Sequence, residues 1–114
     1  MVTSPRDSVF TIPDNGTTSN AINVGPESII GVVMPADANI VGTAITFEGS
    51  FDNSTFYPIL HDGTAVSVDV QTAASIVTLP VEYLHGPYWI RVVSNDTETA
   101  DNGTVITPIW RRFF

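Results

Sequence analysis

The sequence of 114 residues contains no cysteine and no lysine, and its only basic residues are four arginines. Without cysteine there is no disulfide framework, no thiolate ligand for zinc and no cysteine nucleophile. Nucleic-acid binding needs Lys and Arg to neutralise phosphates, yet 12 acidic residues here outweigh the 4 basic ones and give a net charge of −8. The composition therefore argues against a nucleic-acid partner.

Long apolar runs are also missing, because no stretch approaches the roughly 20 residues that a membrane helix needs. The first seven residues lack the basic start and apolar run of a signal peptide, so we expect synthesis in a cytoplasm and no membrane partner. Charged residues make up 14% of the chain and hydrophobic ones 43%. Because disorder requires low hydrophobicity and high charge, we expect one folded domain.

The chain is rich in strand signals. Eight prolines and eight glycines leave few windows for a helix, and the runs between them are rich in Val, Ile and Thr. In 44–51, alternation places Ile45, Phe47 and Phe51 on one face, and in 65–70 the valines share a face. Residues 28–34 and 88–93 are apolar on both faces, which is typical of central strands covered on each side.

Turn signals such as Asp62-Gly63 and Asn102-Gly103 separate these runs. About eight or nine short strands at regular spacing predict an all-β fold, an antiparallel β-sandwich of the jelly-roll or immunoglobulin-like type. We assign it to residues 19–114. Residues 1–18 are polar and turn-rich; either they form an arm that a neighbouring subunit orders, or they are a poorly ordered terminus.

Catalytic and metal-binding patterns are weak. His61 and His85 precede turns, belong to no recognised motif and are expected to be exposed, and no Gly-x-Ser-x-Gly elbow is present. Oxygen ligands in 96–102 and at Asp52-Asn53 suit calcium but lack EF-hand spacing, whereas Asp and Asn commonly bond nearby backbone amides in turns. We therefore predict no enzyme, no metal and no cofactor.

The aromatic residues allow two interpretations. On alternating strands most of them belong between the sheets, but exposed ones could form a platform on which sugars stack. Tyr88 and Trp89 point to opposite faces, so a single core takes at most one of them. The set comprises Phe51, Phe56, Tyr57, Tyr83, Tyr88, Trp89 and Trp110.

The C-terminal stretch is apolar on both faces, and Pro108 indicates an edge strand or a bulge because proline cannot donate to a ladder. The stretch either packs within its own sandwich or anchors a subunit contact, since aromatics and Arg are enriched at interface centres. The candidate partner-binding residues are Arg6, Trp110, Arg111, Arg112, Phe113 and Phe114.

Four segments in order carry a family resemblance: the buried strand 29–35, a Phe-x-Gly-Ser-x-Asp hairpin within 45–58, the turn at 62–64 and an aromatic strand with arginine at 88–94. Together they resemble the small β-sandwich structural proteins of tailed-bacteriophage virions. The resemblance covers roughly residues 21–112 and brings no catalytic or metal residues.

The resemblance implies a head decoration (cement) protein that binds the outer head surface and stabilises it, or a head–tail or tail component. The implied location is the virion, after synthesis in the cytoplasm of the host bacterium, and the implied partners are the capsid protein and copies of the chain itself. A carbohydrate-binding module that attaches to host surface glycans is the alternative from another functional class.

Overall fold

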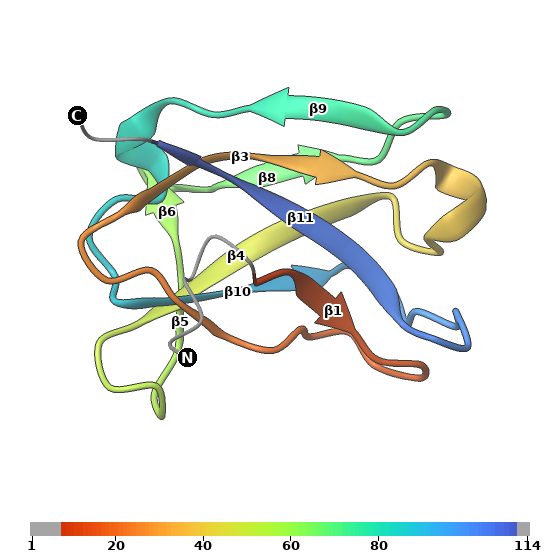
Figure 1. Ribbon diagram of the computed structural model, residues 1–114, viewed down its shortest axis with the longest axis horizontal. Helices are drawn as coiled ribbons and strands as arrows, with labels where there is room; N and C mark the ends of the chain where they lie inside the picture. Colours follow the sequence, from red (N-terminus) through yellow and green to blue (C-terminus); the bar gives the residue numbers. More distant parts are fainter. Residues whose placement is uncertain (1–7, 112–114) are drawn as a thin grey trace.

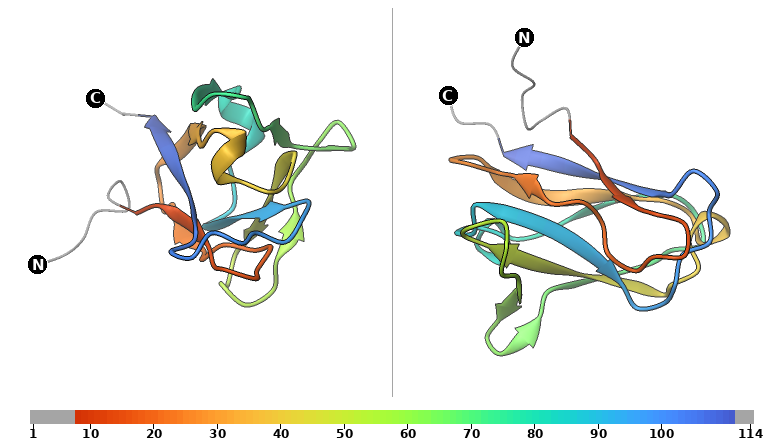
Figure 2. Two further views of the ribbon diagram at one scale, coloured as in Figure 1. Left: turned by 90° about the vertical axis from the view of Figure 1, so that its right-hand side faces the viewer. Right: turned by 90° about the horizontal axis from the view of Figure 1, so that it is seen from below.

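In the computed structural model, which describes residues 8–111, two antiparallel sheets pack face to face (Figures 1 and 2). One sheet has the strand order β1-β11-β3-β9, and the other has β2-β10-β4-β5, with β8 pairing the remaining half of β4. The strands are β1 (Phe10–Ile12), β2 (Ile22–Asn23), β3 (Ser28–Met34), β4 (Ala44–Ser50), β5 (Tyr57–Pro58), β6 (Leu60–His61), β7 (Thr64–Ala65), β8 (Ser67–Asp69), β9 (Ser75–Thr78), β10 (Trp89–Ser94) and β11 (Thr104–Arg111).

This arrangement confirms the all-β sandwich. The described residues form eleven strands instead of eight or nine, because residues 57–69 divide into four pieces of two or three residues. Two short 3-10 turns, η2 (Asp37–Asn39) and η3 (Val81–Tyr83), are the helical elements of residues 8–111. Neither turn is long or apolar enough to cross a membrane.

Alternation along the strands builds the core between the sheets. Ile45 and Phe47 of β4 are fully buried, and Val66 and Val68 point inward as expected. Phe51 does not join them: it lies one residue beyond the end of β4, and 67% of its surface is exposed. The buried hydrophobic core consists of Phe10, Ile12, Ile22, Val24, Ile29, Val32, Met34, Ile40, Ile45, Phe47, Val66, Val68, Leu84, Ile90, Val92 and Ile106.

The two strands that are apolar on both faces are central, as predicted. β3 pairs with β11 and β9, and β10 pairs with β2 and β4. Only their inner faces are fully buried, however: Val33 of β3 is 37% exposed and Trp89 of β10 is half-buried. The expectation of cover on both sides was wrong, because within residues 8–111 no third layer lies over either sheet (Figure 2).

Residues 8–18 belong to the sandwich, so the expected boundary at Ser19 does not hold for them. Phe10 and Ile12 of β1 have no exposed surface, and β1 pairs with β11. Thr18 forms a bridge with Val93 of the opposite sheet. The short alternation of Phe10 and Ile12 was outweighed by the polar residues around it. The remainder of the expected arm, residues 1–7, lies outside the described residues.

β11 lies inside its sheet, between β1 and β3, so Pro108 does not mark an edge strand. The register shifts between Ile109 and Trp110, where β3 carries the extra residue Ile30. The bulge is therefore in β3, and Pro108 itself pairs in register with Val32. β1 pairs only as far as Ile106. Pro108 therefore lies beyond the part of β11 that pairs with β1. Its lack of an N–H breaks no hydrogen bond of that ladder.

Candidate interaction surfaces

Glu98 lies in the acidic loop after β10 and is buried, with 1% of its surface exposed. Its carboxylate accepts hydrogen bonds from the backbone N–H groups of Val41 (2.8 Å) and Gly42 (3.0 Å). The hydroxyls of Ser94 (2.7 Å) and Thr104 (3.2 Å) also donate to it. Four donors satisfy the buried carboxylate, as burial of a charge requires.

The backbone of Glu98 ties in a further segment. Its carbonyl accepts from Asn15 at 2.8 Å, and its N–H donates to the carbonyl of Gly16 at 2.9 Å. Gly42 approaches so closely that a Cβ there would collide with the Ser94 hydroxyl. Glu98 therefore joins four chain segments at this end of the sandwich: residues 15–16, residues 41–42, its own loop from Ser94, and Thr104.

The Asp52 loop, the second acidic loop, follows β4 and is exposed. The Asp52 carboxylate accepts from the backbone N–H groups of Thr55 and Ser54, both at 2.9 Å, and from the Ser50 hydroxyl at 2.9 Å. These bonds, that of Thr55 first, lower the pKa of Asp52 below its ordinary value of 3.8 because they stabilise the charged form. Asn53 in the same turn has φ of 59°.

The Asp52 loop thus follows the turn chemistry favoured from the sequence, whereas the Glu98 carboxylate bonds a segment far away along the chain. Among the described residues, no three His, Asp or Glu side chains converge to hold a metal ion. Beside Glu98, a depression of about 500 Å³ lies between the η2 segment 37–41 and residues 98–100. The carboxylate itself is directed into the protein, toward its four donors.

The two histidines sit in different surroundings. His61 belongs to β6 and its ring lies 4.4 Å from that of Tyr83, so it is partly covered and not a free loop residue. His85 is exposed as expected, and its Nδ1 shares a 2.9 Å hydrogen bond with the hydroxyl of buried Ser28. Ser28, His85 and Arg111 line a small pocket of about 220 Å³ together with Val81 and Glu82.

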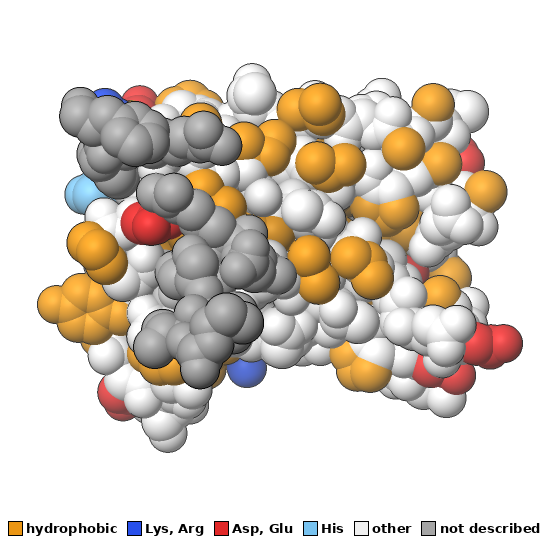
Figure 3. All heavy atoms as spheres, viewed as in Figure 1, with side chains coloured by type: hydrophobic (Ala, Val, Ile, Leu, Met, Phe, Trp, Pro, Cys, Tyr) orange, Lys and Arg blue, Asp and Glu red, His pale blue; other side chains and the backbone are white. Residues whose placement is uncertain are grey.

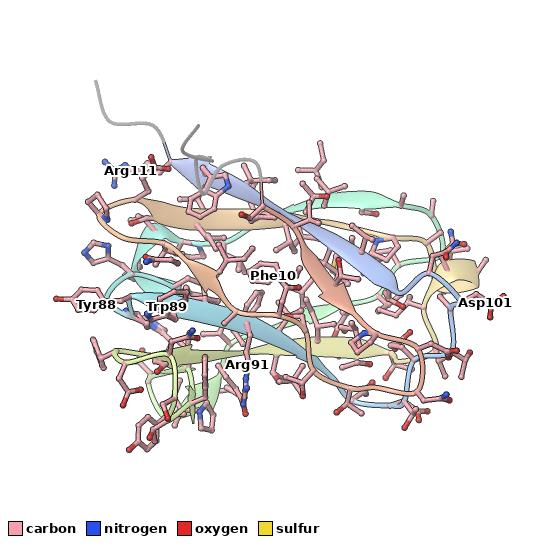
Figure 4. All side chains as sticks on the ribbon, turned by 60° about the horizontal axis from the view of Figure 1, so that its bottom comes forward. Phe10, Tyr88, Trp89, Arg91, Asp101 and Arg111 are labelled. Atoms are coloured by element: carbon pink, nitrogen blue, oxygen red, sulfur yellow. The ribbon has the colours of Figure 1, made fainter. Side chains whose placement is uncertain are left out.

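The C-terminal candidates separate from one another. Trp110 is half-buried and packs against the hydrophobic core, and its indole Nε1 is buried without a hydrogen-bond partner in residues 8–111. Arg111 is exposed at the end of β11 (Figure 4). Arg6, Arg112, Phe113 and Phe114 lie outside the described residues. The self-packing interpretation therefore fits Trp110, and the docking hypothesis for the others stays a prediction.

Most of the aromatic residues expected between the sheets are not in the core; only Tyr83 and Trp110 of that set pack against it. Of the seven in that set, Phe51, Tyr57 and Tyr88 are exposed and the other four are half-buried. Phe10 and Phe47 are the aromatic rings of the core. The error arose because Phe51 and Tyr88 sit just beyond strand ends, where alternation no longer decides burial.

Tyr88 lies at the end of the sandwich opposite Asp101 (Figure 4) and forms an aromatic pair with Phe51. Their ring centroids lie 5.6 Å apart in an edge-to-face arrangement, the geometry that aromatic quadrupoles prefer. Their exposed fractions are 67% and 55%. Two exposed rings in contact make an aromatic surface at the molecule's end.

The outward faces of the two sheets differ in charge. On the β2-β10-β4-β5 sheet, the Arg91 guanidinium binds Glu48, with an Nη2–Oε1 distance of 2.7 Å, and lies 3.9 Å over the Phe56 ring. On the other sheet, cross-strand rows place uncharged residues side by side. The uncharged outer face is the central part of these rows and consists of Thr11, Gly31, Val33, Ile76, Thr78, Val105, Thr107 and Ile109; charged Arg111 follows Ile109 in the same alternation at the end of β11.

The uncharged outer face stands out in an acidic protein. Ile76 is 72% exposed, Val105 46% and Val33 37%. Figure 3 shows hydrophobic side chains across this side of the molecule, with the visible acidic side chains mainly near its margins. The sequence signal for this face was present in β3 and β11, which are apolar on both faces, but it could not show that the outer side was uncovered.

A comparison of the chain with family models, curated proteins and solved structures found no match.

Proposed function

We propose that this chain is a non-enzymatic structural protein of a tailed-phage virion, most specifically a decoration protein that packs on the outer surface of the head and stabilises it. Its partners are then the capsid protein and copies of the chain itself, and its location is the virion. The sequence resemblance supports this proposal, and the uncharged outer face is the single observation that carries it.

The uncharged outer face has the chemistry of a contact surface. The centres of protein interfaces are depleted of charged residues, because burying an unpaired charge costs free energy. The chain has a net charge of −8, yet the eight residues of this face include none that is charged. Exposed Val33, Val105 and Ile76 can be buried there without removing any charge from water.

Binding to heads tests the proposal directly. Purified chain is mixed with phage heads that lack it, and the bound fraction is measured by co-sedimentation. Val105→Asp should reduce binding at least tenfold, because it places a charge inside the contact. Leu60→Asp is the matched control: Leu60 is similarly exposed, at 55%, but lies on the β6–β7 hairpin. Equal binding by Val105→Asp and wild type would contradict the contact.

Cryo-electron microscopy of virions separates the possible positions within the particle. A decoration protein appears in many copies over the head. Density at a unique vertex or along the tail would contradict the decoration role and favour the head–tail or tail component.

A chain truncated after Arg111 keeps β11 intact and tests the docking hypothesis for Arg112, Phe113 and Phe114. We expect this truncated chain to lose binding to heads.

A carbohydrate-binding module is the second candidate, and the Phe51–Tyr88 pair favours it. Exposed aromatic rings present flat apolar faces with which sugar rings can pack. On an array of bacterial surface glycans, Tyr88→Ala and Tyr88→Leu should abolish binding while Tyr88→Phe retains it. Absence of binding to every glycan by the wild-type chain would reject this candidate.

A further inference from the structure

The four-stranded sheet has two edge strands, β1 and β9, and only one of them is closed. At β1, the side-chain amide of Asn20 takes the place of a neighbouring strand. Its Oδ1 accepts from the Thr11 N–H at 2.8 Å, and its Nδ2 donates to the Val9 carbonyl at 3.1 Å. The outward N–H of Thr11 in β1 and the carbonyl of Val9, just before the strand, are thereby paired.

β9 has no such cover among the described residues. In an antiparallel ladder, the backbone groups of alternate residues point toward and away from the partner strand. Leu79 donates to the Ile30 carbonyl at 2.8 Å, and the register pairs Val77 with Val32 and Ile76 with Val33. The N–H and C=O groups of Ile76 and Thr78 therefore point away from β3, into solvent. Figure 1 shows β9 at the rim of the sheet.

Natural proteins commonly protect such edges with lysine, proline, bulges or inward charges. Ser75–Thr78 carries none of these, and the sequence has no charged residue between Asp69 and Glu82. Ile76 is the most exposed large hydrophobic residue of the described chain, at 72%. The edge is therefore open, uncharged and apolar on its solvent side.

We propose that β9 pairs antiparallel with β9 of a second copy, so that two four-stranded sheets join into one continuous sheet across a two-fold axis. A second copy fits because the edge is self-complementary. Placing Ile76 opposite Thr78 of the other copy aligns all the outward N–H and C=O groups and forms four hydrogen bonds. Val77 then lies opposite its own counterpart, with its backbone groups still bonded to β3.

Charge also favours a second copy at this position. Two chains of net charge −8 repel each other, and contact is least unfavourable where neither carries a charge. The pairing would place the two uncharged outer faces side by side as one larger surface. In this respect it rests on the proposed function, because a shell protein that joins its own copies presents a wider contact to the head.

Sedimentation of the purified chain, without any phage head, tests the pairing. The wild-type chain should form a dimer of twice 12.3 kDa in a concentration-dependent way. Ile76→Pro removes an outward N–H that the chain itself does not use, and two of the four intermolecular bonds with it. It should raise the dimer dissociation constant at least tenfold. Ile76→Thr keeps the N–H and should leave the dimer in place.

Cross-linking determines the register in which the two β9 strands pair, and it does not require the proline variant to fold. The chain has no cysteine, so introduced thiols report only on this contact. A mixture of Ile76→Cys and Thr78→Cys chains should form a disulfide dimer, because directly opposed residues lie about 5.5 Å apart. Either variant alone places its thiols on diagonal positions about 7–8 Å apart and should remain largely uncross-linked.

A monomer at all concentrations up to the millimolar range would overturn the pairing, as would a dimer that folded Ile76→Pro leaves unchanged. Cross-linking by a single variant as efficient as that of the mixture would overturn the register. These outcomes are separate from head binding. A monomer that still decorates heads would reject the pairing alone, and a β9 dimer that fails to bind heads would reject the proposed function alone.

Discussion

The loops that follow β4 and β10 each begin with a serine that makes the same hydrogen bonds. The carboxylate to which the serine donates is exposed in the first loop and buried in the second. Ser50 ends β4 and Ser94 ends β10, and each Oγ accepts the N–H two residues later at 3.2 Å. Each hydroxyl also donates to an acid of its loop, Asp52 at 2.9 Å and Glu98 at 2.7 Å. Because β4 and β10 are antiparallel, the loops lie at opposite ends of one ladder.

The two acids differ in how far along the chain they reach. The backbone partners of Asp52, Ser54 and Thr55, are two and three residues away. Those of Glu98, Gly42 and Val41, are 56 and 57 residues away. A carboxylate bonded to its own turn shapes one loop, whereas one bonded across the sandwich holds distant segments together. Hydrogen bonds to a carboxylate therefore stabilise a single loop at the Asp52 end of the sandwich and connect distant segments of the chain at the Glu98 end.

Replacing Glu98 should have the largest effect. Glu98→Ala leaves two backbone N–H groups and two hydroxyls without their acceptor in a buried site. We expect a loss on the order of 3–5 kcal/mol in the free energy of unfolding, measured by urea denaturation. Glu98→Gln should lose less but still be clearly destabilised, because its NH₂ group faces donors. A loss below about 1 kcal/mol for Glu98→Ala would contradict the role assigned to this residue.

The two serines give a matched intermediate test. Ser94→Ala removes one donor to the buried Glu98 carboxylate and should cost about 2 kcal/mol, in the range for hydrogen bonds to charged groups. Ser50→Ala removes the equivalent donor to exposed Asp52 and should cost less, because water can replace that donor at an exposed carboxylate. Thermal denaturation of both variants gives the ranking, and equal losses would show that burial of the acceptor does not matter here.

Asp52→Asn should have the smallest effect, visible mainly in its pH dependence. The folded-state pKa of Asp52 is lowered from 3.8 by its hydrogen bonds, so its charged form stabilises the fold. That stabilisation is present above the unfolded-state pKa and is lost as the pH falls through the folded-state pKa. Denaturation between pH 7 and pH 2 should show the wild type more stable at neutral pH and the difference closing below about pH 3.8.

The fold class was predictable because strands and turns are set by patterns of neighbouring residues. Period-2 alternation placed Ile45 and Phe47 inside, and Asp62-Gly63 forms a turn in which both residues have positive φ. The N-terminal strand was missed because Phe10 and Ile12 are too few to stand out against a polar neighbourhood. Their burial depends on pairing with Val105 and its neighbours in β11, almost a hundred residues away.

The surfaces were harder to predict because they depend on what is uncovered. Alternation shows which residues share a face but not whether that face meets solvent. Val33 and Trp89 were expected to be covered because their strands are apolar on both faces. Glu98 was one acid among several in its loop, and only the folded chain brings Val41 and Thr104 to it. The roles of Arg112, Phe113 and Phe114 stay predictions from sequence.

Asn20 determines how many chains can join through the four-stranded sheet. A sheet with two open edges can add a copy at each side, and nothing then stops its growth into a fibre. Here the amide of Asn20 already bonds the Thr11 N–H and the Val9 carbonyl at one edge. In the pair that we propose through β9, a third copy would have to displace this side chain to add to the β1 edge, so Asn20 opposes growth beyond two.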